Sequence, residues 1–294
     1  MRTTRKFLAA AILISGLFAA ACSNDLFGLF ASTDLDKRLE EKTALKFVTS
    51  AEDSSWVTGT FSPYSGAKPG EGLSLGSSFS FIVVSDTHIE DGDAHGLENL
   101  GSKITSDPAI KFVVITGDIT QNGKREDVQR FVDIAKSLPV PCYPVIGNHD
   151  IFFGNWPIWK ELIGASSYRI DHGSDVRLFI LDTANAYFGA SQLDWLEREL
   201  AINPTVHTFV FTHANVFVRS PIDIEQLTDV RERARFLKIL KGRSDAVFMG
   251  HVHQRIIDDA GGVKYITLED FVGHGTYCRV TVNSGGMSYE FHKL

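Results

Sequence analysis

Cysteine is scarce in this chain of 294 residues, and its three cysteines, Cys22, Cys142 and Cys278, form no C-x-x-C pair. A zinc site built from paired cysteines is therefore excluded. The H-E-x-x-H motif of many metallopeptidases is also missing. Cys142 and Cys278 lie in apolar, strand-like runs, where a lone buried thiol is the default. A bridge between them stays open, because an exported chain meets an oxidising compartment.

Positive charge is in deficit as well. The sequence has 29 Lys and Arg against 36 Asp and Glu, a net charge of −7 with neutral histidine. An acidic chain repels the phosphate backbone, so duplex nucleic acid is not an expected partner. A small phosphoester suits it better than a polymer. The sequence carries no signal for an oligomeric state.

The first apolar run, residues 7–18, is shorter than the roughly 20 residues of a membrane-spanning helix. Basic residues precede it, and Ala19-Ala20-Ala21 lead into Cys22, which is the pattern of an export signal. We therefore expect residues 1–21 to be a cleaved signal peptide. The junction resembles the lipobox of bacterial lipoproteins, which implies an acylated Cys22 and a membrane-anchored lipoprotein, periplasmic or on the cell surface. Because Ala19 stands where that box usually has leucine, a soluble periplasmic or secreted form is the alternative.

Residues 22–78 are predicted to be an N-terminal tether with some local structure. Thr33-Asp34 favours the start of a short helix that runs to Leu45, residues 56–61 favour an extended segment, and residues 65–78 are rich in glycine and serine. The region also holds Phe47 and Trp56, which are too apolar for a fully solvated linker, so docking on the following domain is the alternative.

Residues 79–294 predict one α/β domain. Apolar runs favour buried strands at 79–84, 112–115, 142–146, 178–181, 208–211 and 246–249. Amphipathic spacing favours helices at 124–137 and 191–201. Glycine-punctuated extended segments from Arg255 to Leu294 favour hairpins. Alternating strands and helices that end in antiparallel strands are consistent with two stacked mixed β-sheets flanked by helices.

Five polar segments follow these apolar runs and together supply ligands for metal ions. Half of the ten histidines lie in them: Asp86-Thr87-His88, Gly117-Asp118, Gly147-Asn148-His149-Asp150, Thr212-His213 and Gly250-His251-Val252-His253. Each alone has an ordinary interpretation as a loop, a helix cap or a buried histidine. Together they predict a cleft lined by oxygen and imidazole ligands at the strand ends. The chemistry favoured is metal-assisted phosphoester hydrolysis.

Two neighbours in the third segment have a different predicted role. His149 follows the amide ligand Asn148 and is placed to protonate a leaving oxygen or to stabilise phosphate charge. Asp150 is predicted to hold that imidazole charged and oriented, as in carboxylate–histidine pairs.

In this order, D-x-H, G-D, G-N-H-D, H and G-H-x-H resemble the calcineurin-like metallophosphoesterase superfamily, over essentially residues 79–294. Gly117 to Gly123, with Leu181-Asp182-Thr183 and the later Gln192-Leu193-Asp194-Trp195-Leu196, is similar to its cyclic-nucleotide-phosphodiesterase-like branch. Gln121 replaces the tyrosine typical of purple acid phosphatases. Ala214-Asn215 follows His213 where the branch often shows another histidine, which leaves the substrate open.

The resemblance implies a four-layer αββα sandwich with two divalent ions, Mn, Fe or Zn. Asp86, His88, Asp118 and His253 would hold one ion, and Asp118, Asn148, His213 and His251 the other. A hydroxide that bridges ions about 3.5–4 Å apart would attack a phosphodiester or phosphomonoester, with the diester preferred. The competing hypothesis is a surface-displayed protein that binds phosphate or metal without turnover. Four residues close to the ligands are candidates for contact with the leaving group, or for the core: Phe152, Phe153, Trp156 and Asn215.

Overall fold

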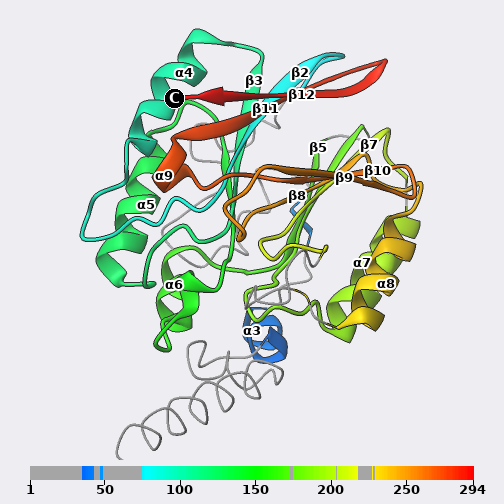
Figure 1. Ribbon diagram of the computed structural model, residues 1–294, viewed down its shortest axis with the longest axis horizontal. Helices are drawn as coiled ribbons and strands as arrows, with labels where there is room; N and C mark the ends of the chain where they lie inside the picture. Colours follow the sequence, from blue (N-terminus) through cyan, green and yellow to red (C-terminus); the bar gives the residue numbers. More distant parts are fainter. Residues whose placement is uncertain are drawn as a thin grey trace, which may run out of the picture.

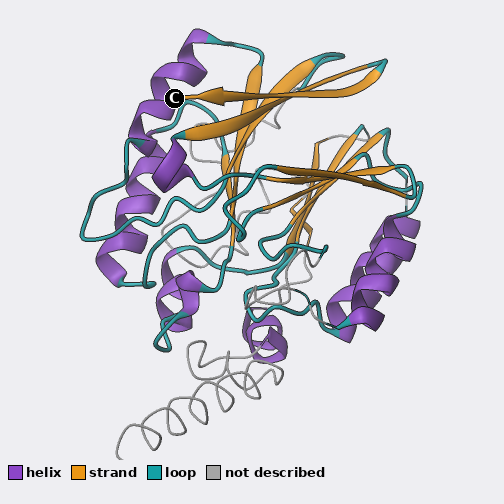
Figure 2. Ribbon diagram, in the orientation of Figure 1, coloured by secondary structure: helices purple, strands orange, loops and turns teal. Residues whose placement is uncertain are grey.

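The computed structural model describes residues 35–42, 47–48, 75–172, 175–202, 204–217, 227 and 229–294. Strands in this part of the chain form two stacked sheets with helices on both outer faces, which gives four layers (Figures 1 and 2). The predicted α/β fold with two stacked mixed sheets is confirmed. The predicted signal peptide, Cys22 and the extended segment at 56–61 lie outside the described residues.

The first sheet has the strand order β12-β11-β2-β3-β4. Its strands are β2 (Phe79–Val84), β3 (Ile110–Thr116), β4 (Cys142–Val145), β11 (Thr276–Asn283) and β12 (Gly286–Lys293). β2, β3 and β4 run parallel, whereas β11 pairs antiparallel with both β2 and β12. Every residue of β2 is buried. A parallel strand covered on both faces needs such an unbroken apolar run.

The second sheet has the order β1-β5-β6-β7-β8-β10-β9. Its strands are β1 (Phe47–Val48), β5 (Tyr168–His172), β6 (Val176–Ile180), β7 (His207–Phe211), β8 (Ala246–Met249), β9 (Ile256–Ala260) and β10 (Val263–Thr267). β6, β7 and β8 are parallel neighbours, while the β9–β10 hairpin is antiparallel. The predicted hairpins after Arg255 are therefore present, although β10 also pairs parallel with β8.

Aromatic side chains fill the space between the sheets. The ring of Phe81 stacks on that of Phe112 at 4.7 Å between centroids and meets Phe209 edge-on at 5.1 Å. Phe211 stacks on Phe248 at 5.3 Å. Because β2 and β3 supply one side of this cluster and β7 and β8 the other, it fixes the distance between the two sheets.

Helices cover the outer faces, as Figure 1 shows: α4, α5 and α6 lie against the first sheet, and α7 and α8 against the second. The described helices are α3 (Leu35–Lys42), α4 (Leu100–Ser106), α5 (Arg125–Ser137), α6 (Trp156–Leu162), α7 (Ala190–Ala201), α8 (Val230–Leu240) and α9 (Phe271–His274), with the short 3₁₀ turns η2 (Leu97–Asn99) and η3 (His149–Ile151). In α5 the buried residues Val128, Phe131, Val132 and Ala135 recur at helical spacing, which turns one face to the core.

The N-terminal helix α3 is docked on the domain. Leu35 and Leu39 are buried against Tyr187. Arg38, also fully buried, donates to both carboxylate oxygens of Asp182 at 2.8 and 2.7 Å. The helix predicted after Thr33-Asp34 is thus present, and the docked alternative describes its position better than a solvated tether.

The cysteines are free and buried, Cys142 on β4 and Cys278 on β11. β2 and β3 separate these strands in the sheet. Neighbouring strands lie about 4.8 Å apart, so the two thiols are too distant for a disulfide.

Among the described helices, none is both long enough and apolar enough to cross a membrane.

Candidate metal centre

All seven predicted ligands follow strands whose carboxyl ends point to the same edge of the molecule. Asp86 and His88 come after β2, Asp118 after β3 and Asn148 after β4 of the first sheet. His213 follows β7, and His251 and His253 follow β8, in the second sheet. Ligands from both sheets therefore meet between the carboxyl ends, where open α/β folds place their sites.

The backbone at this edge is held in an uncommon conformation. Asp86, His88, Asp118, His251 and His253 all have positive φ, between 44° and 73°. Residues other than glycine seldom adopt this left-handed region, and such positions gather at functional sites. Backbone hydrogen bonds to the segment after β3 hold two of them: the amide of Asp86 donates to the Gly117 carbonyl at 3.1 Å and that of His88 to the Asp118 carbonyl at 3.0 Å.

Asp86, His88 and His253 form one group of ligand atoms. Nε2 of His253 lies 3.3 Å from Oδ1 of Asp86 and 3.4 Å from Nε2 of His88. Nδ1 of His88 is buried and has no hydrogen-bond partner among the described residues. Two imidazole nitrogens that face each other beside a carboxylate provide lone pairs for a divalent ion.

A second group surrounds His213. Its Nε2 atom lies 3.1 Å from each of three atoms: Oδ2 of Asp118, Oδ1 of Asn148 and Nδ1 of His251. Ligand atoms that are each about 2.1 Å from one ion are roughly 3 Å apart, so this spacing fits a coordination shell. Nδ1 of His213 lies 2.8 Å from the Thr116 carbonyl, which leaves Nε2 for the ion.

Asp118 connects the two groups. Its carboxylate belongs with His213 and His251 in one ligand triad and with His88 and His149 in another, while His88 is shared with the triad of Asp86 and His253. Two adjacent positions that share one carboxylate are what a binuclear centre requires.

The charges of the site favour a cation there. Burial opposes the charge on His213, but the adjacent Asp118 carboxylate outweighs it and raises the pKa of His213 to about 10. Burial likewise opposes the ionised form of Asp118, yet His213 and His149 hold its pKa below the usual range. The buried carboxylate thus favours a positive charge beside His213, and a divalent ion bound there would supply that charge in place of the proton.

Glycine makes the close approach of the segments possible. A Cβ atom at Gly117, whose φ is 93°, would overlap the ring of His213, and one at Gly250 would overlap Ser85 Oγ and the Asp86 carboxylate. Substitution at either position would push a ligand out of place.

His149 and Asp150 do not form the predicted pair. Nδ1 of His149 lies 2.8 Å from the Gln121 carbonyl, whereas the Asp150 carboxylate accepts hydrogen bonds from the amides of Thr120 and Gly147 at 2.8 and 2.9 Å. Burial, and secondarily the charge of Asp118, raises the pKa of Asp150 to about 7. Asp150 therefore ties together the loops that follow β3 and β4, and a backbone carbonyl orients His149.

Residues 79–255 match the profile of the calcineurin-like phosphoesterase family. The chain belongs to this family. It is a metal-dependent phosphoester hydrolase, and its candidate metal ligands form the three adjacent groups described above. The predicted superfamily and its cyclic-nucleotide-phosphodiesterase-like branch are confirmed.

Curated relatives of this phosphoesterase include a probable glycerophosphodiester phosphodiesterase GpdQ of Arcobacter nitrofigilis, 31% identical over 59% of this chain and 71% of that protein. The 3′,5′-cyclic adenosine monophosphate phosphodiesterase CpdA of Escherichia coli is 24% identical over 62% and 70% of the two chains. A dimetal phosphatase of Danio rerio shares the fold, with a TM-score of 0.59 and 16% identity over 75% of this chain and 96% of its own.

Several contacts of the phosphoesterase site carry no signal in the sequence. The carbonyls of Thr116 and Gln121, which orient His213 and His149, are backbone atoms that any residue type supplies. The Ser85 hydroxyl donates to the Asp86 carboxylate. Its position directly before Asp86 is the one feature of the sequence that could have suggested a role for Ser85.

The four residues considered for the leaving group divide into two kinds. Trp156 and Asn215 are buried, and Asn215 donates to the Thr267 hydroxyl at 2.7 Å, so both belong to the core. The ring of Phe152 is half-buried and lies 4.4 Å from that of His149. Phe153 is 70% exposed.

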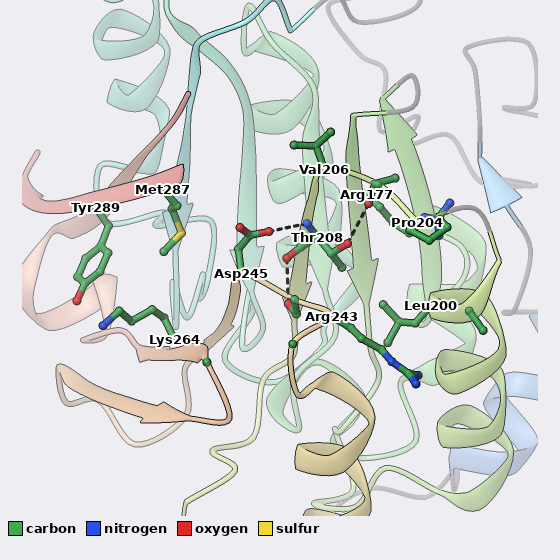
Figure 3. Close-up of a pocket in the computed structure, with 15 residues that line it drawn as sticks. Arg177, Leu200, Pro204, Val206, Thr208, Arg243, Asp245, Lys264, Met287 and Tyr289 are labelled. Carbon is green, nitrogen blue, oxygen red and sulfur yellow. Dashed lines mark hydrogen bonds between the residues drawn. The ribbon is translucent and has the colours of Figure 1, made fainter. Parts of the chain in front are cut away.

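A separate cavity of about 720 Å³ lies at the amino ends of strands in the second sheet, opposite the carboxyl ends that carry the candidate metal ligands (Figure 3). It is lined by residues at the starts of β6, β7, β8 and β10, among them Arg177, Thr208, Asp245 and Lys264. None of the predicted ligands lines it, so it is not part of the metal site.

Proposed function

We propose that this phosphoesterase hydrolyses a small phosphodiester with the help of two divalent ions. The observation that carries the proposal is the pair of ligand groups joined through Asp118, with His149 beside them on the side toward solvent. The preference for a diester is supported by the relatives, whose names describe hydrolysis of glycerophosphodiesters and of cyclic adenosine monophosphate.

Each residue then has a distinct task. Asp86, His88, Asp118, Asn148, His213, His251 and His253 hold the ions. Divalent ions in such a site supply a Lewis acid and a water nucleophile at neutral pH. His149 keeps Nδ1 on the Gln121 carbonyl, so Nε2, which lies 4.0 Å from Oδ2 of Asp118, faces the cleft and is placed to protonate the leaving oxygen.

The decisive experiment is an assay of purified protein loaded in turn with Mn²⁺, Zn²⁺ or Fe²⁺. We expect hydrolysis of bis(4-nitrophenyl) phosphate with a higher kcat/KM than that of 4-nitrophenyl phosphate. The Asp118→Asn variant, prepared in the same way, controls for contaminating phosphatase and should be inactive. Metal binding without turnover of any diester or monoester would instead support the alternative of a non-catalytic phosphate-binding protein.

We also propose that the enzyme is exported and anchored to a membrane through an acylated Cys22. The support is the basic, apolar and small-residue order of residues 1–21. In a bacterial host, radiolabelled palmitate should be incorporated into the wild type and lost in Cys22→Ser, which should also leave the membrane fraction. If the wild type incorporated no palmitate and Cys22→Ser stayed in the membrane fraction to the same extent, the proposed anchor would be contradicted.

A further inference from the structure

Phe153 occupies a position in the chain that its residue type does not favour. The amide of Asn155 donates to the Phe152 carbonyl at 3.1 Å, which closes a turn with Phe153 and Gly154 at its centre. Both central residues have positive φ, 56° and 81°. Turns with two such residues strongly prefer glycine, asparagine or aspartate at both positions. Phenylalanine there is therefore strained.

No packing in the described structure compensates for this strain. The Phe153 side chain is 70% exposed, and its ring meets that of Phe152 edge-on at 6.1 Å between centroids. A strained residue whose side chain is left in solvent contributes little to folding. Residues held in a backbone conformation that their type disfavours are common at functional sites.

The turn is fixed beside the reacting centre. Phe152, which precedes Phe153, lies with its ring 4.4 Å from that of His149. The Asn155 side chain donates to the Asn122 carbonyl at 2.8 Å and so attaches the turn to the loop that orients His149. The rings of His149, Phe152 and Phe153 are therefore in contact one after the other, from the candidate metal ligands to the exposed Phe153.

We propose that Phe153 is a stacking platform for a planar ring carried by the substrate, and that this ring is a nucleobase or a similar aromatic group. The inference rests on the proposed function, because it assigns the organic part of the phosphoester. Aromatic side chains bind bases by stacking, and an exposed, rigidly held ring keeps the entropic cost of such a contact low. A glycerol group would gain nothing comparable from it, and a choline group would gain a cation–π contact rather than the stacking of two planar rings.

The test compares two ligands that differ only in the base, adenosine 5′-monophosphate and ribose 5-phosphate. Calorimetry on Mn²⁺-loaded full-length protein should show that the wild type binds the nucleotide about tenfold more tightly. Phe153→Asn should abolish that preference and leave the affinity for ribose 5-phosphate unchanged, while Phe153→Tyr should keep the preference. Val206→Asn, which alters an equally exposed apolar residue near the distant cavity, is the matched control.

A second measurement separates binding from folding. Asparagine suits the turn better than phenylalanine, so Phe153→Asn should unfold at the same or a higher temperature than the wild type. A clear drop in Tm would show that the ring supports the fold and would overturn the inference. An unchanged nucleotide preference in Phe153→Asn would overturn it equally.

The inference and the proposed function can fail separately. Absence of diester hydrolysis by the wild type would refute the proposed reaction, whereas calorimetry would still report whether Phe153 recognises a base. Normal hydrolysis together with equal affinities for the two ligands would retain the reaction and refute the platform.

Discussion

His149 lies among the metal ligands but differs from them in its contacts. Its Nδ1 atom is 2.8 Å from a backbone carbonyl, and its side chain is 24% exposed, whereas Asp118 and His213 beside it are almost fully buried. An imidazole whose Nδ1 is fixed by a backbone carbonyl and whose side chain is partly exposed suits proton transfer better than a role as a metal ligand.

Replacement of His149 by alanine should therefore slow catalysis and leave the metal content near that of the wild type. Loss of a general acid costs about 100-fold or more when the leaving group is a poor one, such as an alkoxide, and much less for 4-nitrophenolate. Steady-state rates with alkyl and nitrophenyl diesters, together with elemental analysis of the same samples, test this.

His207→Ala provides the control, since His207 begins β7 at the far end of the sheet. Its rates and metal content should equal those of the wild type. Loss of bound metal from His149→Ala would mean that His149 is a ligand, as its position in a triad with His88 and Asp118 allows.

The sequence contained enough information to predict which candidate ligands come together, but not the contacts that support them. Asp86, Asp118 and His213 each follow an apolar run, and the end of a buried strand can be located by that pattern alone. The partner of His149 was predicted to be Asp150, because adjacency favoured a carboxylate, whereas the structure uses the Gln121 carbonyl. Backbone carbonyls are common to all residue types, so no sequence pattern identifies one.

At the scale of elements, helix α3 adds a part to the enzyme that lies outside residues 79–255 of the family match. Arg38 donates to Asp182 and, at 2.6 Å, to Asn185, and its guanidinium lies 6.0 Å from the ring centre of Trp156. Asp182 and Asn185 follow β6 of the second sheet, and Trp156 begins α6, which covers the first. The helix therefore bridges the two halves of the fold, below the other elements in Figure 1.

Arg38→Ala should destabilise the whole domain, because Asp182 would keep a buried charge without its partner. Breaking a buried ion pair from one side costs about 3–5 kcal/mol. Denaturant unfolding measures the change. The surface pair of Arg125 and Glu161 serves as the comparison, and Arg125→Ala should leave the unfolding midpoint unchanged. A midpoint for Arg38→Ala close to that of the wild type would show that α3 docks without supporting the domain.

The elements differ in how well the sequence predicted them. β2 and β8 have the predicted bounds, and α5 begins one residue later than expected, because an unbroken apolar run or a helical repeat is a local signal. The burial of Arg38 was not predicted. Its partners are about 145 positions away in the chain, and an isolated arginine normally indicates a solvated surface.

At the scale of the whole molecule, the metal site joins the two sheets. β2, β3 and β4 supply Asp86, His88, Asp118 and Asn148 from one sheet, and β7 and β8 supply three histidines from the other. The unfolded chain does not bring these residues together, so ions held by them would bind the folded state selectively. The free energy of metal binding at this site would therefore add to the free energy of unfolding of the whole domain.

Removal of metal by a chelator should lower the Tm, and added Mn²⁺ should restore it in a concentration-dependent manner. A single site filled at 100 times its Kd adds about 2.7 kcal/mol to the free energy of unfolding. Asp118→Asn, which weakens the ligand common to both groups, should show a much smaller rise of Tm with Mn²⁺ than the wild type. Differential scanning calorimetry over a series of Mn²⁺ concentrations measures both. Equal Tm values with and without Mn²⁺ in the wild type would mean that the ligands from the two sheets do not close on a common ion.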